Sequence, residues 1–246
     1  MPAEIRRTVL NRRSLIAGIS ATTSLALAGC TTSQPRLVQQ LPNLRPEPPM
    51  GSAVAMYGPV VDQGYPIPAV PVEEIDPIYL RQIVRDPTGE RPGTVVVDTS
   101  NHFLYLVRPG GEAMRYGVGL GREGFEWAGR AEIEWKQAWP RWFPPEEMID
   151  REPELEKYRA EFDKESGEWL GGMPAGITNP LGARALYIYQ DGKDTLYRLH
   201  GSPEWWSIGK SVSSGCVRLM NQDIIDLYDR VPEKSPILVT SGLRTV

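Results

Sequence analysis

Only two cysteines, two histidines and four phenylalanines occur in the 246 residues of this chain. Two cysteines exclude a disulfide framework, and two histidines far apart in sequence fall short of the three or four ligands that a zinc site needs. The formal net charge of −4 lacks the basic excess of nucleic-acid-binding proteins. The sequence therefore predicts a protein without a metal, without an organic cofactor and without a nucleic-acid partner.

Proline and glycine, by contrast, are abundant, with 23 and 24 residues. Both residue types favour turns and β-structure over long helices, and a hydrophobic content of 41% is ordinary for a globular domain. A chain of this length accommodates one domain with flanking tails.

Residues 1–30 are predicted to be an export signal. Four arginines precede an apolar stretch from Ser14 to Leu27, which is too short to span a membrane. Leu27-Ala-Gly-Cys30 resembles the lipobox of bacterial lipoproteins, whose cysteine becomes the lipid-modified first residue of the mature chain. The resemblance implies lipidation at Cys30 and a periplasmic protein anchored to a membrane. Thr31 is not the aspartate that favours inner-membrane retention, so the outer membrane is preferred.

Residues 31–92 are predicted to be a proline-rich linker followed by a segment at the domain edge. The first part cannot bury enough apolar surface to fold and is expected to be extended. Residues 77–84 are apolar enough for a short helix or strand packed on the domain, and a turn follows them. The main domain is predicted over residues 93–246.

The pattern of the main domain is mainly β. Asp191-Gly192 predicts a hairpin, and apolar residues at helical spacing over 224–231 predict one amphipathic helix, which Asn221 can cap. Many short strands with few helices indicate a sandwich or a barrel-like pair of sheets. Strand-forming runs separated by turn residues lie at 94–99, 103–107, 113–119, 131–139, 184–189, 195–200 and 236–240.

Three further features are the glycine-dense run, the long excursion between two predicted strands, and the second histidine. The glycine-dense run 117–124 lacks the Lys-Ser/Thr of a nucleotide-binding loop and is predicted to be a turn. The excursion from 140 to 172 carries large aromatic residues, which fit either a small hydrophobic cluster or a wall of a substrate groove. Residues 152–162 within it are expected to form a solvent-facing helix. His102, at a predicted turn, is assigned local hydrogen bonding.

One stretch brings chemically active residue types together. His200 ends a strand-like run and Cys216 begins another. A thiolate is a nucleophile, and a neighbouring imidazole can take the thiol proton and return it to a leaving amine. If the two strands are neighbours in one sheet, the two side chains can meet. Gly201 and Gly215 permit tight backbone turns, and main-chain N–H groups near Cys216 could face a developing oxyanion.

The motif around these residues runs from His200-Gly201 to Ser213-Ser-Gly-Cys-Val-Arg218 and resembles the signature of the L,D-transpeptidase catalytic domain. The similarity extends over roughly residues 93–241, and blocks in this order are a specific signal. It implies an L,D-transpeptidase-type β-sandwich with few short helices. The other blocks that carry it are Val97-Asp-Thr-Ser-Asn101, Asn179-Pro-Leu-Gly182 and Arg184-Ala-Leu-Tyr187.

The resemblance implies a cysteine-dependent acyltransferase that acts on peptidoglycan. In this family the cysteine attacks the amide between a meso-diaminopimelic residue and the terminal D-Ala of a tetrapeptide stem. D-Ala leaves, and an amine resolves the thioester. By resemblance, Cys216 is the nucleophile, His200 is the base, and the carbonyl of Gly201 is the third member of the catalytic group. Arg218 corresponds to the arginine near the carboxylate of the donor stem.

Four more residues are candidates for substrate binding. Ser214 stands where many family members carry a second histidine, so no second imidazole role is assigned, and Ser213 precedes it. Trp205 and Trp206 are adjacent tryptophans in a Gly/Ser loop, which is a poor position for a core. A lid or a substrate platform is the preferred interpretation of this pair.

The sequence leaves the acyl acceptor open. The acceptor could be the amine of another stem, a lysine of an envelope protein, or water, in which case the enzyme is an L,D-carboxypeptidase. A different reading is a peptidoglycan-binding lipoprotein without catalysis, against which the presence of both chemical residues argues. The expected partners are peptidoglycan peptide stems and a membrane reached through the lipid anchor.

Overall fold

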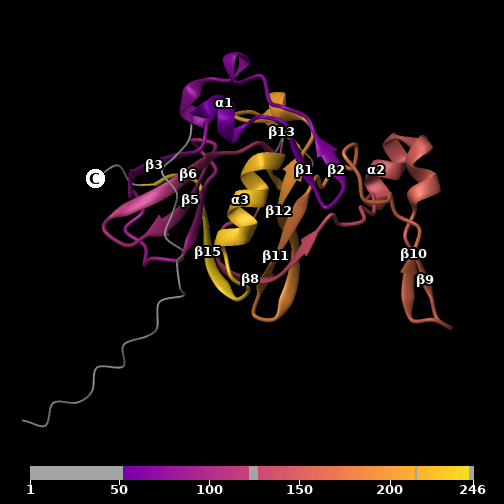
Figure 1. Ribbon diagram of the computed structural model, residues 1–246. Coiled ribbons are helices and arrows are strands. Elements are labelled where there is room, and N and C mark those ends of the chain that lie inside the picture. Colours follow the sequence, from indigo (N-terminus) through magenta and orange to yellow (C-terminus); the bar gives the residue numbers. More distant parts are fainter. Residues whose placement is uncertain (1–51, 122–126, 214, 244–246) are drawn as a thin grey trace, which may run out of the picture. The chain divides into compact units, whose positions relative to one another are not determined.

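The computed structural model describes residues 52–243, except 122–126 and 214 (Figure 1). The predicted export signal with Cys30 and the first part of the predicted linker lie outside the described residues. The described chain is mainly β with a few short helices, which confirms the predicted fold class. None of these helices is long and apolar enough to cross a membrane.

Nine strands form one continuous mixed sheet. They are β3 (Gln82–Arg85), β4 (Val95–Asp98), β5 (Phe103–Arg108), β6 (Glu112–Gly117), β8 (Gly129–Ala138), β11 (Arg184–Gln190), β12 (Lys193–Ser202), β14 (Val217–Met220) and β15 (Ser235–Thr240). The order from edge to edge is β14-β12-β11-β8-β15-β4-β5-β6-β3. The pairs β12–β14 and β4–β15 are parallel, and the other pairs are antiparallel. All seven strands predicted from the sequence are present.

The two halves of this sheet enclose the main core together with helix α3 (Asn221–Arg230). Val95 and Leu104 reach the core from one half, and Leu186 and Leu199 reach it from the other. In Figure 1, α3 lies in front of the strands that carry the second pair. The two layers of the predicted sandwich are therefore two halves of one hydrogen-bonded sheet.

Helix α3 is fixed to the sheet at its apolar face and at its end. Ile224, Leu227 and Val231 are fully buried, as the helical spacing predicts. Lys136 of β8 donates hydrogen bonds to the carbonyls of Tyr228 and Val231, both at 2.7 Å. A cation at the last carbonyls of a helix satisfies acceptors that lack an intrahelical partner. The end of α3 is thereby joined to the second half of the sheet.

The start of α3 differs from the prediction. Met220 occupies the cap position, and no side-chain hydrogen bond caps the helix. The side-chain oxygen of Asn221 instead accepts a hydrogen bond from the main-chain N–H of Ala183 at 2.9 Å. The prediction of Asn221 as a helix cap is therefore wrong, because its oxygen joins α3 to the residue that precedes β11.

The hairpin between β11 and β12 has the predicted two-residue turn. Asp191 and Gly192 both have positive φ, 50° and 74°. Such a turn matches the right-handed twist of the strands that it connects. The turn therefore sets the register that brings His200 opposite Ala185.

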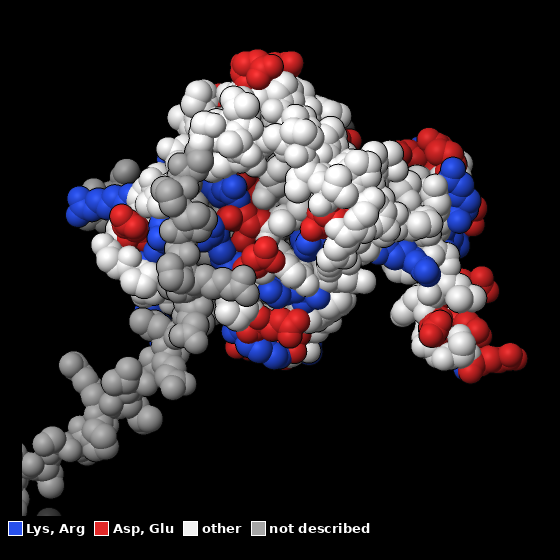
Figure 2. Space-filling model, viewed as in Figure 1, with Lys and Arg blue, Asp and Glu red and all other residues white. Residues whose placement is uncertain are grey.

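The segment that precedes β3 packs on the domain through buried polar contacts. Asp62 accepts two hydrogen bonds from the Arg184 guanidinium, at 2.7 and 2.9 Å, and a third from the indole of Trp139. Figure 2 shows positive and negative side chains interspersed over the face that carries α3. The elements of the segment are α1 (Ala53–Met56), β1 (Val60–Asp62), β2 (Tyr65–Ile67) and the 3-10 turns η1 (Val72–Glu74) and η2 (Pro77–Tyr79).

Tyr57 ties this segment to α3. Its hydroxyl lies 2.9 and 3.0 Å from the two carboxylate oxygens of Asp223 and donates to this carboxylate. The same hydroxyl accepts a hydrogen bond from the main-chain N–H of Arg81 at 2.6 Å. The Arg81 guanidinium in turn pairs with Asp226 at 2.9 Å. The Tyr57 side chain is buried. Its hydroxyl therefore satisfies the Asp223 carboxylate and the Arg81 N–H at a place that water reaches poorly.

Tyr57→Phe is expected to lower the free energy of unfolding by about 2 kcal/mol, because it removes the hydroxyl that donates to the buried Asp223 carboxylate and accepts from the main-chain N–H of Arg81. Urea denaturation of the purified protein measures the change. Tyr65→Phe is the matched control, since the Tyr65 hydroxyl has no hydrogen-bond partner among the described residues. Equal stability of the two variants would show that the Tyr57 contacts contribute nothing.

The excursion between β8 and β11 is the least regular part of the domain. It contains α2 (Glu146–Arg151), the 3-10 turn η3 (Pro153–Tyr158) and the strands β9 (Glu161–Asp163) and β10 (Glu168–Leu170). The predicted helix over 152–162 is present only as the 3-10 helix Pro153–Tyr158, which begins at a proline in the first helical position, and the rest of that range passes into the hairpin of β9 and β10. Phe162 and Trp169 pair there with ring centroids 5.2 Å apart, and Trp169 stays 58% exposed. Figure 1 shows this hairpin extending beside the domain.

Candidate active site

The structure brings His200 and Cys216 to adjacent strands. Strands β12 and β14 run parallel, with Leu199 opposite Val217 and His200 opposite Arg218. Cys216 directly precedes Val217. Because side chains alternate along a strand and Leu199 and Val217 are buried in the main core, His200, Cys216 and Arg218 belong to the opposite face of the sheet.

The imidazole of His200 is buried and held in one orientation. Its Nδ1 donates to the carbonyl of Gly201 at 2.6 Å, which leaves Nε2 as the basic nitrogen. Burial lowers the pKa of His200 to about 4, and the charge of Arg218 acts in the same direction, whereas the main-chain carbonyls of Gly201 and Pro180 oppose the shift. His200 is therefore a neutral imidazole at neutral pH and can accept a proton.

Cys216 is half-buried at the end of the loop that leads into β14. Burial raises the pKa of the Cys216 thiol, against a main-chain hydrogen bond at Arg198 and the positive charges of Arg198 and Arg218. The pair therefore rests as a thiol and a neutral imidazole instead of an ion pair. Such a pair reacts by general-base catalysis, in which the proton leaves sulfur as the sulfur attacks.

Close packing requires glycine beside the histidine. A Cβ atom at Gly201 would lie 2.4 Å from the side-chain oxygen of Asn221, and one at Gly182 would lie 2.3 Å from the same oxygen. Gly215, next to the thiol, has a φ of 128°, a conformation that other residues rarely adopt. The backbone on both sides of the pair thus depends on the absence of a side chain.

Arg218 has an anionic partner and an unused donor. Its Nη1 lies 2.6 Å from a carboxylate oxygen of Glu204, and its Nε has no hydrogen-bond partner within the described residues. The main chain of Arg218 exchanges two hydrogen bonds with Gly119, at 2.8 and 2.9 Å. The glycine-dense run predicted to be a simple turn therefore reaches the site and fixes the strand that follows Cys216.

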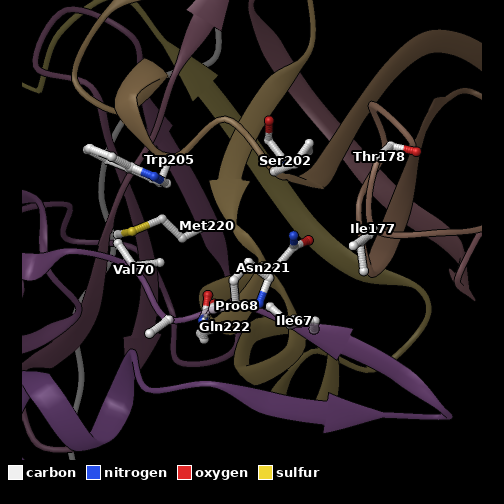
Figure 3. A pocket seen from close by; sticks show the side chains of 12 residues that line it. Ile67, Pro68, Val70, Ile177, Thr178, Ser202, Trp205, Met220, Asn221 and Gln222 are labelled. Carbon is white, nitrogen blue, oxygen red and sulfur yellow. Dashed lines mark hydrogen bonds between the residues drawn. The ribbon is translucent and has the colours of Figure 1, made fainter.

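The two candidate tryptophans have different environments. Trp205 is half-buried against Met220 and Ile208, whereas Trp206 is 53% exposed. Both belong to the 3-10 turn η4 (Trp205–Ser207). Trp205 also lines a cavity of about 90 Å³ (Figure 3). The prediction that tryptophans at this position avoid the core therefore fits Trp206 and not Trp205.

The loop before Cys216 is described in part. Ser213 ends β13 (Ser211–Ser213), which pairs with β7 (Leu120–Gly121), whereas Ser214 lies outside the described residues.

The second histidine, His102, hydrogen-bonds through Nε2 to the hydroxyl of Ser211 at 3.0 Å. The expectation of local hydrogen bonding by His102 is wrong, because its partner is distant in sequence. No three His, Cys, Asp or Glu side chains gather as metal ligands in the part of the chain that the structure describes.

Sequence reasoning missed three side chains on the face that carries Cys216. Tyr187 lies opposite Arg198 on one side and opposite Trp135 on the other. The Trp135 and Tyr187 rings stack with centroids 3.6 Å apart, and the Arg198 guanidinium lies 4.5 Å from the Tyr187 ring centre. Alternation of side chains along β11 and β12 could have predicted that Tyr187 and Arg198 lie on this face. Their contact with Trp135 could not be predicted without knowing which strands pair.

The sequence profile of the YkuD family, the L,D-transpeptidase catalytic domain, matches residues 92–239. The chain belongs to this family. The matched range contains both His200 and Cys216 of the L,D-transpeptidase signature. It excludes residues 52–91, although Ile67 and Val70 from this segment line the cavity next to Trp205 (Figure 3).

The chain matches only part of the length of the curated relatives in this family. A probable L,D-transpeptidase of Escherichia coli (strain K12), ErfK/SrfK, is 33% identical over 143 residues, which is 56% of this chain and 41% of the relative. The chain thus matches less than half of that protein.

Two solved structures are similar to the chain, both with TM-scores below 0.5. A protein of Brucella melitensis, described as a probable carnitine operon oxidoreductase caia, is 45% identical and covers 64% of this chain and 91% of its own, with a TM-score of 0.44. An L,D-transpeptidase from Mycobacterium smegmatis is 21% identical and covers 60% of this chain and 58% of its own, with a TM-score of 0.41. With TM-scores below 0.5, neither structure contributes to the functional assignment.

Proposed function

We propose that this protein is an L,D-transpeptidase that acts on tetrapeptide stems of peptidoglycan through a thioester on Cys216. The observation that carries the proposal is the placement of Cys216 and His200 on one face of two adjacent parallel strands, within a domain of this family. Gly201 orients the imidazole, and Arg218 lies on the same face with Glu204 as its anionic partner. By resemblance, Arg218 is the candidate partner of the substrate carboxylate. The pKa directions of the pair suit a general-base mechanism.

The first half of the reaction forms the acyl-enzyme. His200 takes the proton from the Cys216 thiol as the sulfur attacks the carbonyl of the diaminopimelic residue. The bond between carbon and sulfur forms, and the bond between this carbon and the nitrogen of D-Ala breaks. The imidazolium of His200 returns its proton to the departing amine, so D-Ala leaves neutral at its amino group.

The second half resolves the thioester. An acceptor amine loses a proton to His200 and attacks the thioester carbonyl, and Cys216 recovers the proton as a thiol. Attack by water in place of the amine would yield a trimmed stem, which is the product of an L,D-carboxypeptidase. The positive charges of Arg198 and Arg218 near the sulfur stabilise the thiolate as it leaves.

Intact-mass spectrometry with a purified tetrapeptide tests the proposal. The protein should gain the mass of the stem minus D-Ala, and the adduct should disappear when an amine acceptor is added. Tetrapeptide-rich sacculi then distinguish the acceptors, because cross-linked stems, trimmed stems and protein-linked stems are different products. Binding of the stem without an adduct and without release of D-Ala would instead support the non-catalytic peptidoglycan-binding lipoprotein.

We also propose that the protein is anchored to a membrane through a lipid on Cys30, in the periplasm. The support is the lipobox-like sequence that ends at this cysteine. Cys30→Ala is expected to move most of the protein from the membrane fraction to the soluble periplasmic fraction, because one residue carries the lipid. Fractionation followed by immunoblotting measures this change. An unaltered distribution would remove the anchor from the proposal.

A further inference from the structure

A row of side chains leads away from the nucleophile across the open face of the sheet. Extension of the register between β12 and β14 by one residue puts Cys216 opposite Arg198. Arg198 lies opposite Tyr187 on β11, and Tyr187 lies opposite Trp135 on β8. The row therefore crosses four strands at one level, and α3 covers the other face.

Trp135 reaches this face because of a β-bulge. Tyr187 pairs with Trp135 and Ile188 pairs with Ile133, so Glu134 is an extra residue in β8. Ile133 is buried in the main core, and strict alternation would have turned Trp135 toward the core as well. A bulge re-aims the side chain that follows it, and bulges are frequent next to active sites. The side chain of Glu134, the extra residue, pairs with Lys234.

The aromatic pair is rigid and supported from within the row. The rings of Trp135 and Tyr187 are stacked and nearly parallel, with an interplanar angle of 8°. Arg198 covers the other side of Tyr187 and is itself fixed by two hydrogen bonds to Asp194, at 2.7 and 2.8 Å. The hydroxyl of Tyr187 donates to the side chain of Gln137. Tyr187 is thus enclosed, and Trp135 is the exposed end of the row.

The outer side of Trp135 is open. The next strand, β15, begins at Ser235, which pairs with Ile133, so β8 has no strand neighbour at Trp135 among the described residues. The indole is 37% exposed, and its N–H has no acceptor within the described part of the chain. A flat apolar surface with a donor at its edge remains available beside the site.

We propose that Trp135, supported by Tyr187 and Arg198, is a stacking platform for a sugar ring of the glycan to which the peptide stem is attached. This inference rests on the proposed function. A pyranose ring has one apolar face of C–H groups and a rim of hydroxyls, so it can cover an aromatic ring while a hydroxyl accepts from the indole N–H. The enzyme would therefore prefer stems that are still attached to glycan over free peptides.

The dimensions of the row agree with this occupant. Three strand spacings of about 4.8 Å separate Cys216 from Trp135, which is roughly 14 Å. Between the scissile bond and the sugar the stem has three residues, which span roughly 10 Å when extended. The short acid linker of the muramic sugar adds the remaining reach. A stem whose carbonyl lies at the Cys216 sulfur can therefore place its sugar at Trp135.

The test compares two substrates that share one stem. These are the free tetrapeptide and the same tetrapeptide attached to the disaccharide of N-acetylglucosamine and N-acetylmuramic acid, with kcat/KM for D-Ala release as the readout on the full chain. The unsubstituted protein should prefer the disaccharide form about tenfold, the scale of one aromatic contact. Trp135→Ala should lose this preference and keep its rate on the free peptide within about twofold, and Trp135→Tyr should retain most of the preference.

Trp169→Ala is the matched control, since Trp169 is an exposed tryptophan on β10, and it should leave both rates unchanged. Equal rates of the unsubstituted protein on the two substrates, or an equal loss by Trp135→Ala on both, would overturn the platform. If neither substrate releases D-Ala, the proposed function fails and calorimetric binding of the disaccharide-tetrapeptide decides the platform. Weaker binding by Trp135→Ala alone would support it, and equal binding by both proteins would refute it.

Discussion

Cys216→Ala should reduce D-Ala release from a purified tetrapeptide by about 10⁴-fold or more, because the proposed acyl-enzyme is a thioester on this sulfur. Alanine replaces a half-buried sulfur at the start of a strand, so the fold should be retained. Chromatographic quantification of D-Ala measures the effect, and the melting temperature checks that the variant is folded.

Cys30→Ala is the matched control for this experiment, since it removes the other cysteine of the chain. In detergent-free solution it should release D-Ala at the rate of the unsubstituted protein. Turnover that survives in Cys216→Ala would eliminate the thioester and with it the proposed reaction. Loss of activity in both variants would indicate that the lipid-modified form is required.

His200→Ala should lower kcat by about 10³- to 10⁴-fold, the contribution of a well-placed general base. The pH profile separates this role from a structural one. In the unsubstituted protein the pKa of His200 is about 4, so the rate should fall only as the pH drops through about 4, where the imidazole becomes protonated. Because burial raises the thiol pKa, the profile should be flat across neutral pH.

The variant should have a different slope. Without the imidazole, reaction depends on the small fraction of thiolate, which rises about tenfold for each pH unit below the thiol pKa. The residual rate of His200→Ala should therefore climb with pH, and stopped assays between pH 5 and 9 measure it. His102→Ala is the control and should follow the flat profile. A flat residual profile in His200→Ala would show that His200 does not accept the thiol proton.

The sequence predicts which side chains of a strand face the core. It does not predict which strands lie next to each other in the sheet. Apolar residues at Leu199 and Val217 fix which face is buried, and His200 and Cys216 follow from alternation alone. The adjacency of β12 and β14 is a parallel pairing across an intervening loop, for which a single strand pattern contains no signal. The family resemblance supplied that adjacency as an expectation before the register showed it.

Local exceptions account for the errors. The run 131–139 alternates in sequence, yet the extra residue Glu134 reverses the direction of every side chain that follows it. Asn221 has a residue type that caps helices, but a nearby N–H of Ala183 takes its oxygen. Both outcomes depend on partners distant in the chain, which local propensity does not describe.

The connection between β12 and β14 leaves one strand and returns to its parallel neighbour, so the positions of His200 and Cys216 are set by the ladder of hydrogen bonds and not by the length of chain that joins them. Residues at the exposed part of this connection, around Trp206, can therefore be changed without displacing the reactive pair, whereas Glu204 and Trp205 are fixed by their contacts with Arg218 and Met220. Evolution can alter what this loop recognises while the chemistry beneath it stays unchanged, and an engineer could graft a different loop onto the same two strands.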